Sequence, residues 1–169
     1  MIVSLAEGTL KTKYGTFKEV LFYDGQKEII VLIMGSIKNE SDVLCRVHSS
    51  CIFGHYFNSI ECDCQEQMNS SQKLIQEAGK GLIILLDQEG KGNGHLALLN
   101  SVQYKRQGIS QAEAYKLSGY KEDARDFSQA AKVLKYLKVR SIIMLTDNPE
   151  KTKTMNDHGV NVSGTLKTS

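Results

Sequence analysis

Residues 81–86 read GLIILL, a short apolar run with no polar residue inside it. A run of this length without alternation predicts a strand that is buried on both faces. A second run of the same kind, SIIML, occupies residues 141–145. Both segments are therefore predicted to be interior strands, and they decide the fold class.

Helical patterns alternate with these two strands. The first helical pattern covers residues 65–78, and Gly79, which follows it, is a natural helix end. Asn148 is predicted to be the N-cap of a further helix, with Pro149 at its first position. The three patterns themselves cover residues 65–78, residues 95–107 and residues 127–137.

The first fifty residues predict β-structure instead. β-Branched and aromatic residues recur in three segments around an Asp24-Gly25 turn: residues 15–22, 28–34 and 43–48. A β-rich beginning followed by alternating helices and strands predicts an α+β (mixed α/β) fold. A length of 169 residues predicts one domain spanning residues 1–169.

Composition excludes several classes of protein. The net charge of +2 argues against a dedicated nucleic-acid binder, and the longest apolar stretch, residues 29–34, is far too short to cross a membrane. The N-terminus lacks the apolar run of a signal peptide. We therefore expect a cytoplasmic protein, in which closely spaced cysteines are metal ligands or reactive thiols rather than disulfides.

Cys51, Cys62 and Cys64 fall within fourteen residues, and this spacing predicts a zinc site. Three thiolates with one position open to water describe a catalytic site, which is the favoured interpretation. His55 could instead complete a closed, structural shell of four ligands. Cys45 lies within a predicted strand and is expected to be a small core residue.

Four segments together resemble the GTP cyclohydrolase II family: RVHSSC-x10-CDCQEQM (46–68), LLDQEGKGNGH (85–95), DARDF (123–127) and LTDNPEKT (145–152). The resemblance implies a zinc enzyme that opens the imidazole ring of GTP, with release of formate and pyrophosphate, in riboflavin biosynthesis. It also implies one Zn²⁺ per chain, Mg²⁺ with the nucleotide phosphates, and a homodimer.

The resemblance further implies residue roles. Cys51, Cys62 and Cys64 would hold the metal. Asp123 matches a proton acceptor, and Arg125 matches a residue that receives the nucleotidyl group as pyrophosphate leaves. The positions implied to contact the nucleotide are Arg46, Val47, His48, Ser49, Ser50, Gln67, Glu89, Gly90, Lys91, Gln111, Thr146 and Lys151.

The sequence departs from the family pattern at positions implied to lie near the substrate. Ser50 replaces a carboxylate, Lys91 an arginine, Gln111 a threonine and Val102 a tyrosine. Two histidines are also introduced, His55 and His95, and imidazole side chains are candidate replacement acid or base groups.

Two alternative functions stay open at this point. The chain could be a divergent enzyme acting on another nucleotide, such as a uridine nucleotide, in catabolism or specialised metabolism. It could also be a non-catalytic, zinc-stapled nucleotide-binding protein, if His55 closes the metal shell. The identity of the metal ligands separates this last function from the enzymatic ones.

Overall fold

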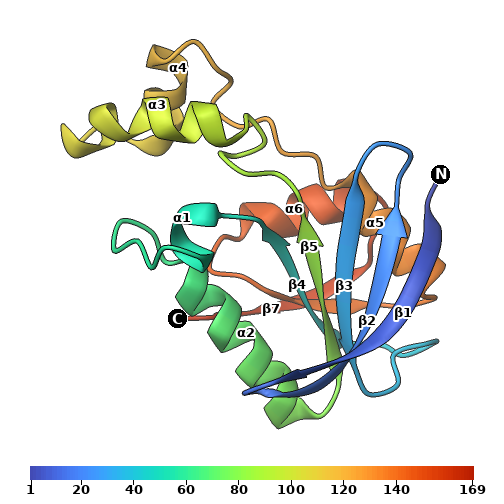
Figure 1. Cartoon of the computed structure of the whole chain (residues 1–169). Helices are drawn as coiled ribbons and strands as arrows, with labels where there is room; N and C mark the ends of the chain where they lie inside the picture. Colours follow the sequence, from blue (N-terminus) through green and yellow to red (C-terminus); the bar gives the residue numbers. More distant parts are fainter.

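A computed structural model describes residues 1–169 and places every strand in one seven-stranded sheet (Figure 1). The strand order is β1-β2-β3-β5-β4-β6-β7. The strands are β1 (Val3–Thr12), β2 (Gly15–Tyr23), β3 (Glu28–Met34), β4 (Val43–Ser49), β5 (Gly81–Leu86), β6 (Ile142–Leu145) and β7 (Val162–Leu166).

The sheet is mixed, and the direction of pairing changes at β5. Strands β1, β2, β3 and β5 pair antiparallel to their neighbours, whereas β5, β4, β6 and β7 pair parallel to one another. The carboxyl ends of β4, β5 and β6 therefore meet at the same edge of the sheet. Ligand sites of mixed and parallel sheets are typically built at this edge, and the predicted α+β (mixed α/β) class is confirmed.

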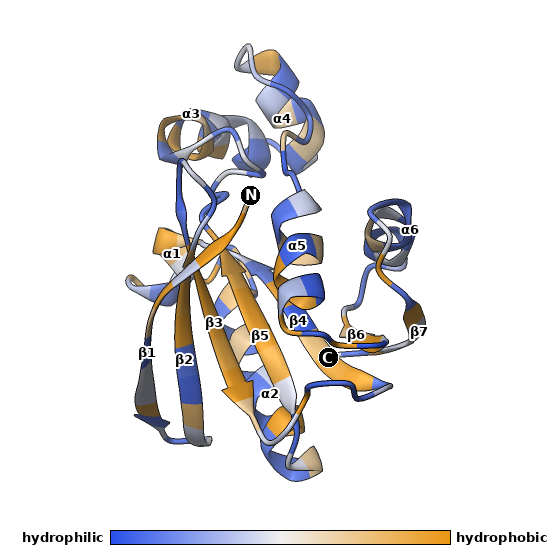
Figure 2. Cartoon of the chain, turned by 90° about the vertical axis from the view of Figure 1, so that its right-hand side faces the viewer, coloured by the Kyte–Doolittle hydropathy of each residue, from blue (hydrophilic) through white to orange (hydrophobic).

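Helices cover both faces of the sheet (Figures 1 and 2). Helix α2 packs on one face through Ile75, while α5 packs on the other through Val133 and Leu134. Helices α3 and α4 stand together beyond the carboxyl edge of the sheet (Figure 1). The helices are α1 (Ile52–His55), α2 (Cys64–Ala78), α3 (His95–Arg106), α4 (Gln111–Leu117), α5 (Ser128–Tyr136) and α6 (Glu150–Asp157).

The central strand β5 contributes to both halves of the core. Ile83 packs with Ile75 on the α2 side, whereas Leu82 and Ile84 pack into the larger cluster on the α5 side. All three side chains are at most 1% exposed. The prediction that GLIILL is buried on both faces is confirmed, and Figure 2 shows the strongest hydrophobic colouring on the central strands.

Helix boundaries follow the predicted signals closely, with one correction. Gly79 ends α2 in a left-handed conformation with φ of 74°. Asn148 lies one residue before the N-cap, which is Pro149, so the predicted start of α6 was one residue early. Asn148 Oδ1 nevertheless accepts a hydrogen bond from the Glu150 N–H at 3.0 Å and so performs the capping contact. None of the helices has the length and apolarity needed to span a membrane.

Candidate metal centre and substrate cavity

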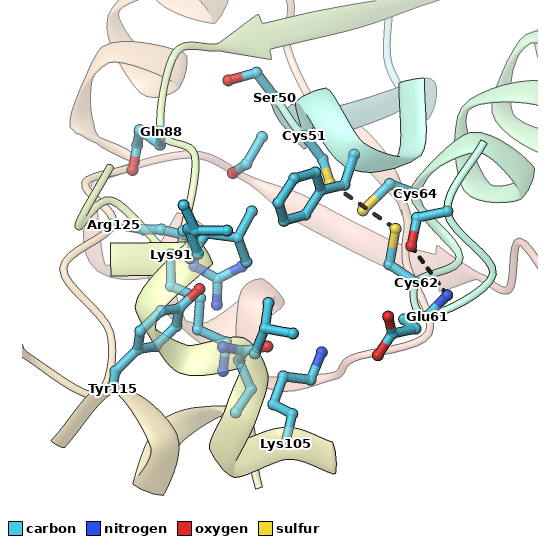
Figure 3. A pocket seen from close by; sticks show the side chains of 18 of the residues that line it. Ser50, Cys51, Glu61, Cys62, Cys64, Gln88, Lys91, Lys105, Tyr115 and Arg125 are labelled. Carbon is cyan, nitrogen blue, oxygen red and sulfur yellow. Dashed lines mark hydrogen bonds between the residues drawn. The ribbon is translucent and has the colours of Figure 1, made fainter. Parts of the chain in front are cut away.

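Three cysteine thiols converge at the carboxyl edge of the sheet (Figure 3). Cys51 follows β4 and caps α1, Cys64 is the first residue of α2, and Cys62 lies in the loop between these helices. The three sulfur atoms lie within 4.8 Å of one another, and the Cys51 and Cys62 sulfurs are 3.9 Å apart. All are free thiols. The fold thus brings the side chains of Cys51, Cys62 and Cys64 together as three soft ligand groups.

Gly54 in α1 makes room for these sulfurs. A Cβ atom at this position would lie 2.9 Å from Cys62 Sγ, 3.1 Å from Cys64 Cβ and 3.6 Å from Cys51 Sγ. Any larger residue would press directly on the cluster. The glycine is therefore required by the close approach of the three thiols to the helix.

The donor set fits a thiophilic divalent cation. Burial raises the pKa of Cys51 and of Cys64. Charge repulsion from Cys51 and Cys62 raises the pKa of Cys64 further, and repulsion from Cys62 raises that of Cys51. A cation among the sulfurs offsets both effects, because metal binding stabilises the deprotonated thiolates. Three thiolates at this spacing suit Zn²⁺.

His55 does not join the thiol group that could hold a metal. Its Nδ1 lies 3.4 Å from the Cys51 N–H, and its Nε2 lies 3.0 Å from Nε2 of His48. His48 Nδ1 in turn accepts a hydrogen bond from Arg46 Nε at 3.1 Å. Burial, helped by the charge of Arg46, lowers the pKa of His48 to about 2, so the ring is neutral and its proton lies on Nε2. His48 and His55 are thus linked through one hydrogen bond between their Nε2 atoms.

Arg46 is a buried connector rather than an exposed cation. It is 3% exposed, and its remaining donors bind the Leu145 carbonyl at 2.9 Å and Gln67 Oε1. Gln67 Nε2 then donates to Asp63 Oδ2 at 2.7 Å. Because Asp63 separates Cys62 from Cys64, this network braces the segment that carries two of the thiols.

A cavity of about 440 Å³ opens beside the sulfurs. Figure 3 shows the thiols on one side of it and Lys91, Arg125 and Tyr115 on the other. Part of the wall is apolar, formed by Phe53, Leu98, Leu99 and Val102, and part is cationic, formed by Lys91, Lys105, Arg106 and Arg125. The shape and charge suit a ligand with a flat apolar portion and an anionic portion.

The glycine-rich loop between β5 and α3 positions Lys91. Gly90 and Gly92 have φ of 62° and 84°, and a Cβ atom on either would lie within 2.6 Å of backbone atoms. Glu89, which is 8% exposed, accepts from the Ile52 N–H at 3.3 Å and contacts His95 Nδ1 at 2.5 Å. The carboxylate therefore ties this loop to α1 and α3.

Asp123 and Arg125 form a two-point ion pair beside the loop. Arg125 Nε and Nη2 donate to Asp123 Oδ1 and Oδ2 at 3.0 and 2.6 Å. Burial disfavours the charged form of Asp123, but the hydrogen bonds from Arg125 outweigh it and hold the pKa of the carboxyl below its ordinary value. Asp123 thus stays ionised next to a guanidinium group that lines the cavity.

Positive charge is in excess near the carboxyl ends of β4 and β6. Burial, together with the charges of Arg46 and Arg125, lowers the pKa of Lys151 to about 7. Thr146, 4% exposed, follows β6 in the same region and accepts from the Asn148 N–H at 3.0 Å. An anion bound here would relieve the repulsion among these cations.

One known protein family matches almost the whole chain. The model of the family described as GTP cyclohydrolase II matches residues 4–167. The chain belongs to this family. A GTP cyclohydrolase-2 of Haemophilus influenzae (strain PittEE) is 38% identical over 161 residues, which cover 94% of this chain and 74% of the relative. The riboflavin biosynthesis protein RibBA of Endomicrobium trichonymphae is 36% identical over 156 residues, covering 91% of this chain and 39% of that protein.

A solved structure shares the fold of this GTP cyclohydrolase II family member. It is RibBX, a two-domain 3,4-dihydroxy-2-butanone 4-phosphate synthase from A. baumannii, with a TM-score of 0.56 and 15% identity. The match covers 98% of this chain and 40% of the larger protein. At this identity the likeness concerns the fold alone. Family membership confirms both the resemblance read from the sequence and the class of enzyme, a hydrolase of the GTP cyclohydrolase II family.

The residues expected to contact substrate in this family fall into two groups. Those that line the cavity are Ser49, Ser50, Gly90, Lys91, Gln111 and Arg125, together with the three cysteines. Those that lie outside its lining are Arg46, Val47, His48, His55, Gln67, Glu89, His95, Asp123, Thr146 and Lys151. Their roles toward a nucleotide stay predictions, and several of them instead position the residues that do line the cavity.

Part of the cavity wall could not be predicted from the sequence motifs. The residues of the wall that received no role from the sequence come from α1, the loop before Cys62, the loop after β5, α3 and α4: Phe53, Ser59, Glu61, Gln88, Leu98, Leu99, Lys105, Arg106 and Tyr115. Glu61 and Arg106 form an exposed ion pair of 3.0 Å between the loop before Cys62 and α3.

Proposed function

We propose that this chain is a zinc-dependent nucleotide cyclohydrolase that opens the imidazole ring of GTP, releasing formate and pyrophosphate. The observation that carries the proposal is the cavity itself, which places three thiols opposite Lys91 and Arg125. A metal-binding end and a cationic end within one cavity match the two chemical parts of a nucleoside triphosphate. Membership of the GTP cyclohydrolase II family supports the same reaction.

Cys51, Cys62 and Cys64 would hold the ion. A zinc ion bound there would supply a Lewis acid and activated water at neutral pH. Phe53, Leu98 and Val102 form an apolar wall on which a flat heterocycle can lie. The network from Arg46 through Gln67 to Asp63 keeps the thiols in register while the substrate binds.

Lys91 and Arg125 would bind the phosphates, with Mg²⁺ assisting. Arginine offers a directional fork and lysine a point charge, so the two complement each other on a triphosphate. Arg125 is also proposed to receive the nucleotidyl group as pyrophosphate leaves. Asp123, which accepts hydrogen bonds from two nitrogens of that guanidinium, would accept the proton that Arg125 loses.

His55 and His95 are proposed as auxiliary proton carriers. His55 is linked through His48 to Arg46, and His95 contacts Glu89. Both rings are half-buried next to the cavity wall, but each has at least one nitrogen engaged with a neighbour. We therefore assign them a supporting role behind Asp123.

A second substrate is favoured by one observation. Ser50, Lys91, Val102 and Gln111, the four substitutions relative to the family pattern noted above, all line the cavity. Hydrogen-bonding sites discriminate strongly between substrates, so these changes could select another base. A uridine nucleotide, in catabolism or specialised metabolism, is the alternative that we carry forward.

The wider assignments stay predictions of the same proposal. We place the enzyme in riboflavin biosynthesis, acting as one catalytic domain over residues 1–169 and assembling as a homodimer with one Zn²⁺ per chain. A small-molecule nucleotide is its partner, and nucleic acid and membranes are not. Analytical ultracentrifugation of the full chain tests the homodimer.

The test is to incubate the purified chain with Zn²⁺ and each common nucleoside triphosphate. Formate, pyrophosphate and the ultraviolet spectrum are followed together. Ring opening of GTP, with about equimolar formate and pyrophosphate, is expected. Loss of ring absorbance from UTP with GTP untouched would favour the alternative substrate.

Two cysteine variants make the test specific for the metal. Cys51→Ser should lose most bound zinc and at least about 100-fold in turnover, since activation of water depends on the ion. Cys45→Ala is the matched control, because Cys45 is fully buried in the core and lies outside the thiol group. X-ray absorption showing three sulfurs and one nitrogen, with no nucleotide turned over, would favour a non-catalytic binding protein instead.

A further inference from the structure

Tyr115 stands out among the residues that line the cavity. It lies in α4 and is 1% exposed, so its ring is almost entirely enclosed by protein. It nevertheless belongs to the cavity wall, and Figure 3 shows its hydroxyl group directed into the cavity. A buried tyrosine normally provides its hydroxyl with a polar partner, and here that group faces the space where substrate would bind.

The surroundings hold this side chain in one place. Ser101, in α3, is its polar neighbour, and the Ser101 hydroxyl already donates to the Leu98 carbonyl at 2.7 Å and accepts from Gln111 Nε2 at 2.9 Å. Ser110 caps α4 by accepting from the Glu113 N–H at 3.3 Å. The hydroxyl of Tyr115 is thereby preorganised, as a group that recognises a substrate needs to be.

The phenol lies across the cavity from the three thiols (Figure 3). Burial raises the pKa of Tyr115 to about 12, and the charges of Cys51 and Glu89 contribute to the rise. The hydroxyl therefore keeps its proton at neutral pH and acts as a donor. Most other residues that α3 and α4 contribute to the wall are either aliphatic, such as Val102, or charged, such as Lys105.

We propose that the Tyr115 hydroxyl donates a hydrogen bond to an acceptor atom of the heterocyclic base, at the ring that is opened. An oxygen or nitrogen of that ring gains negative charge as the ring opens, so a fixed neutral donor stabilises the transition state more than the ground state. Tyr115 is then a substrate-contacting residue. This inference rests on the proposed cyclohydrolase function.

Tyr115→Phe tests the inference, because it removes one oxygen atom and keeps the buried ring. With the zinc-loaded full chain we expect kcat to fall about 100-fold, as for loss of one preorganised donor, and KM to change less than about threefold. Zinc content and Tm should match the wild type. The control is Tyr104→Phe: Tyr104 lies in α3, is half-buried and does not line the cavity, so its kcat should stay within about twofold.

The outcomes separate this inference from the function on which it rests. An active wild type with an equally active Tyr115→Phe variant would overturn the inference and leave the cyclohydrolase assignment intact. A variant that loses zinc or thermal stability in proportion to kcat would also overturn it, because the hydroxyl would then support the structure rather than the substrate. A zinc-loaded wild type that opens no nucleotide ring would overturn the function first, and the inference with it.

Discussion

Lys151 shows how single charges are placed around this site. Its side chain lies among Arg46 and Arg125, and burial lowers its pKa to about 7. An amine in such surroundings is poorly stabilised as a cation until an anion arrives. Lys151 is thus expected to destabilise the ligand-free protein and to be stabilised by a bound anion such as a phosphate.

Lys151→Gln should stabilise the ligand-free chain in a pH-dependent way. The native pKa of Lys151 lies below its unfolded value of 10.5, so the destabilisation it causes is largest below pH 7. It fades as the pH rises from about 7 toward 10.5, because the unfolded state then binds more protons than the native state. We expect the variant to exceed the wild-type Tm by at least about 3 °C near pH 6, with a smaller difference near pH 9.

Thermal unfolding in phosphate-free buffer across this pH range measures the effect. Lys153→Gln is the control, because Lys153 is an exposed residue of the same helix. A Tm difference for Lys151→Gln that does not vary with pH would contradict the placement of this amine.

The three thiols that could hold a metal were predicted from the sequence, but the direction of other side chains was not. Cys51, Cys62 and Cys64 were identifiable because ligand type and spacing carry that information. Arg46 was expected to face the nucleotide, yet its donors turn inward to His48, Leu145 and Gln67, which only the tertiary structure reveals. Direction of a side chain is not encoded in a motif.

At the scale of elements, helix α1 is a single turn that passes close to the three thiols. It spans Ile52–His55 and separates Cys51 from the loop that carries Cys62. Its one glycine faces the sulfurs, so the helix can pass close to the ion site. Helix α1 therefore acts as a short spacer between Cys51 and that loop, and none of its residues belongs to the hydrophobic core clusters.

Gly54→Ala should therefore weaken metal binding more than stability. The added methyl group would lie 2.9 Å from Cys62 Sγ, too close for the present arrangement. We expect zinc affinity to fall at least about tenfold, in the range seen when the support of a metal ligand is disturbed. Competition with a chromophoric chelator measures it.

Gly164→Ala is the matched control for this change. Gly164 lies in β7, and a Cβ atom there would meet nothing within 4 Å. Unchanged zinc affinity in Gly54→Ala would show that the thiols do not approach α1 as closely as described.

Elements were predictable where the hydrophobic pattern was strong. Strands β3 and β5 were placed at their observed ends, because each is a continuous apolar run. Strands β1 and β7 gave no such pattern, since most of their residues are exposed or half-buried and their pairing depends on distant partners. Helix α4 has seven residues, too few for a clear period. Because α4 carries Tyr115 and was not predicted from the sequence, this part of the cavity wall was not predicted either.

At the scale of the whole molecule, the hydrophobic core and the metal centre are separate. The two core clusters are built around the sheet, α2, α5 and α6, and neither contains Cys51, Cys62 or Cys64. The free energy of folding therefore comes mainly from apolar burial away from the thiols. A metal held by the three thiols would therefore act mainly on the 51–64 segment.

Removal of zinc by a chelator should accordingly abolish turnover and leave the sheet folded. We expect far-UV circular dichroism to change little and Tm to fall by about 5–10 °C, since a ligand that binds only the native state adds to its stability. Readdition of Zn²⁺ should restore both activity and Tm. Complete unfolding on chelation would instead show that the core depends on the ion.

The turn between β1 and β2 lies at the opposite edge of the sheet from the thiols. It is formed at Lys13 and Tyr14, where Thr12 and Gly15 pair, and it neighbours the C-terminal end of α2 rather than its cysteine end. Reporter peptides or immobilisation handles could be grafted there without obstructing ligand entry. Such a chimera would let a biosensor surface present every molecule with its cavity facing the solution.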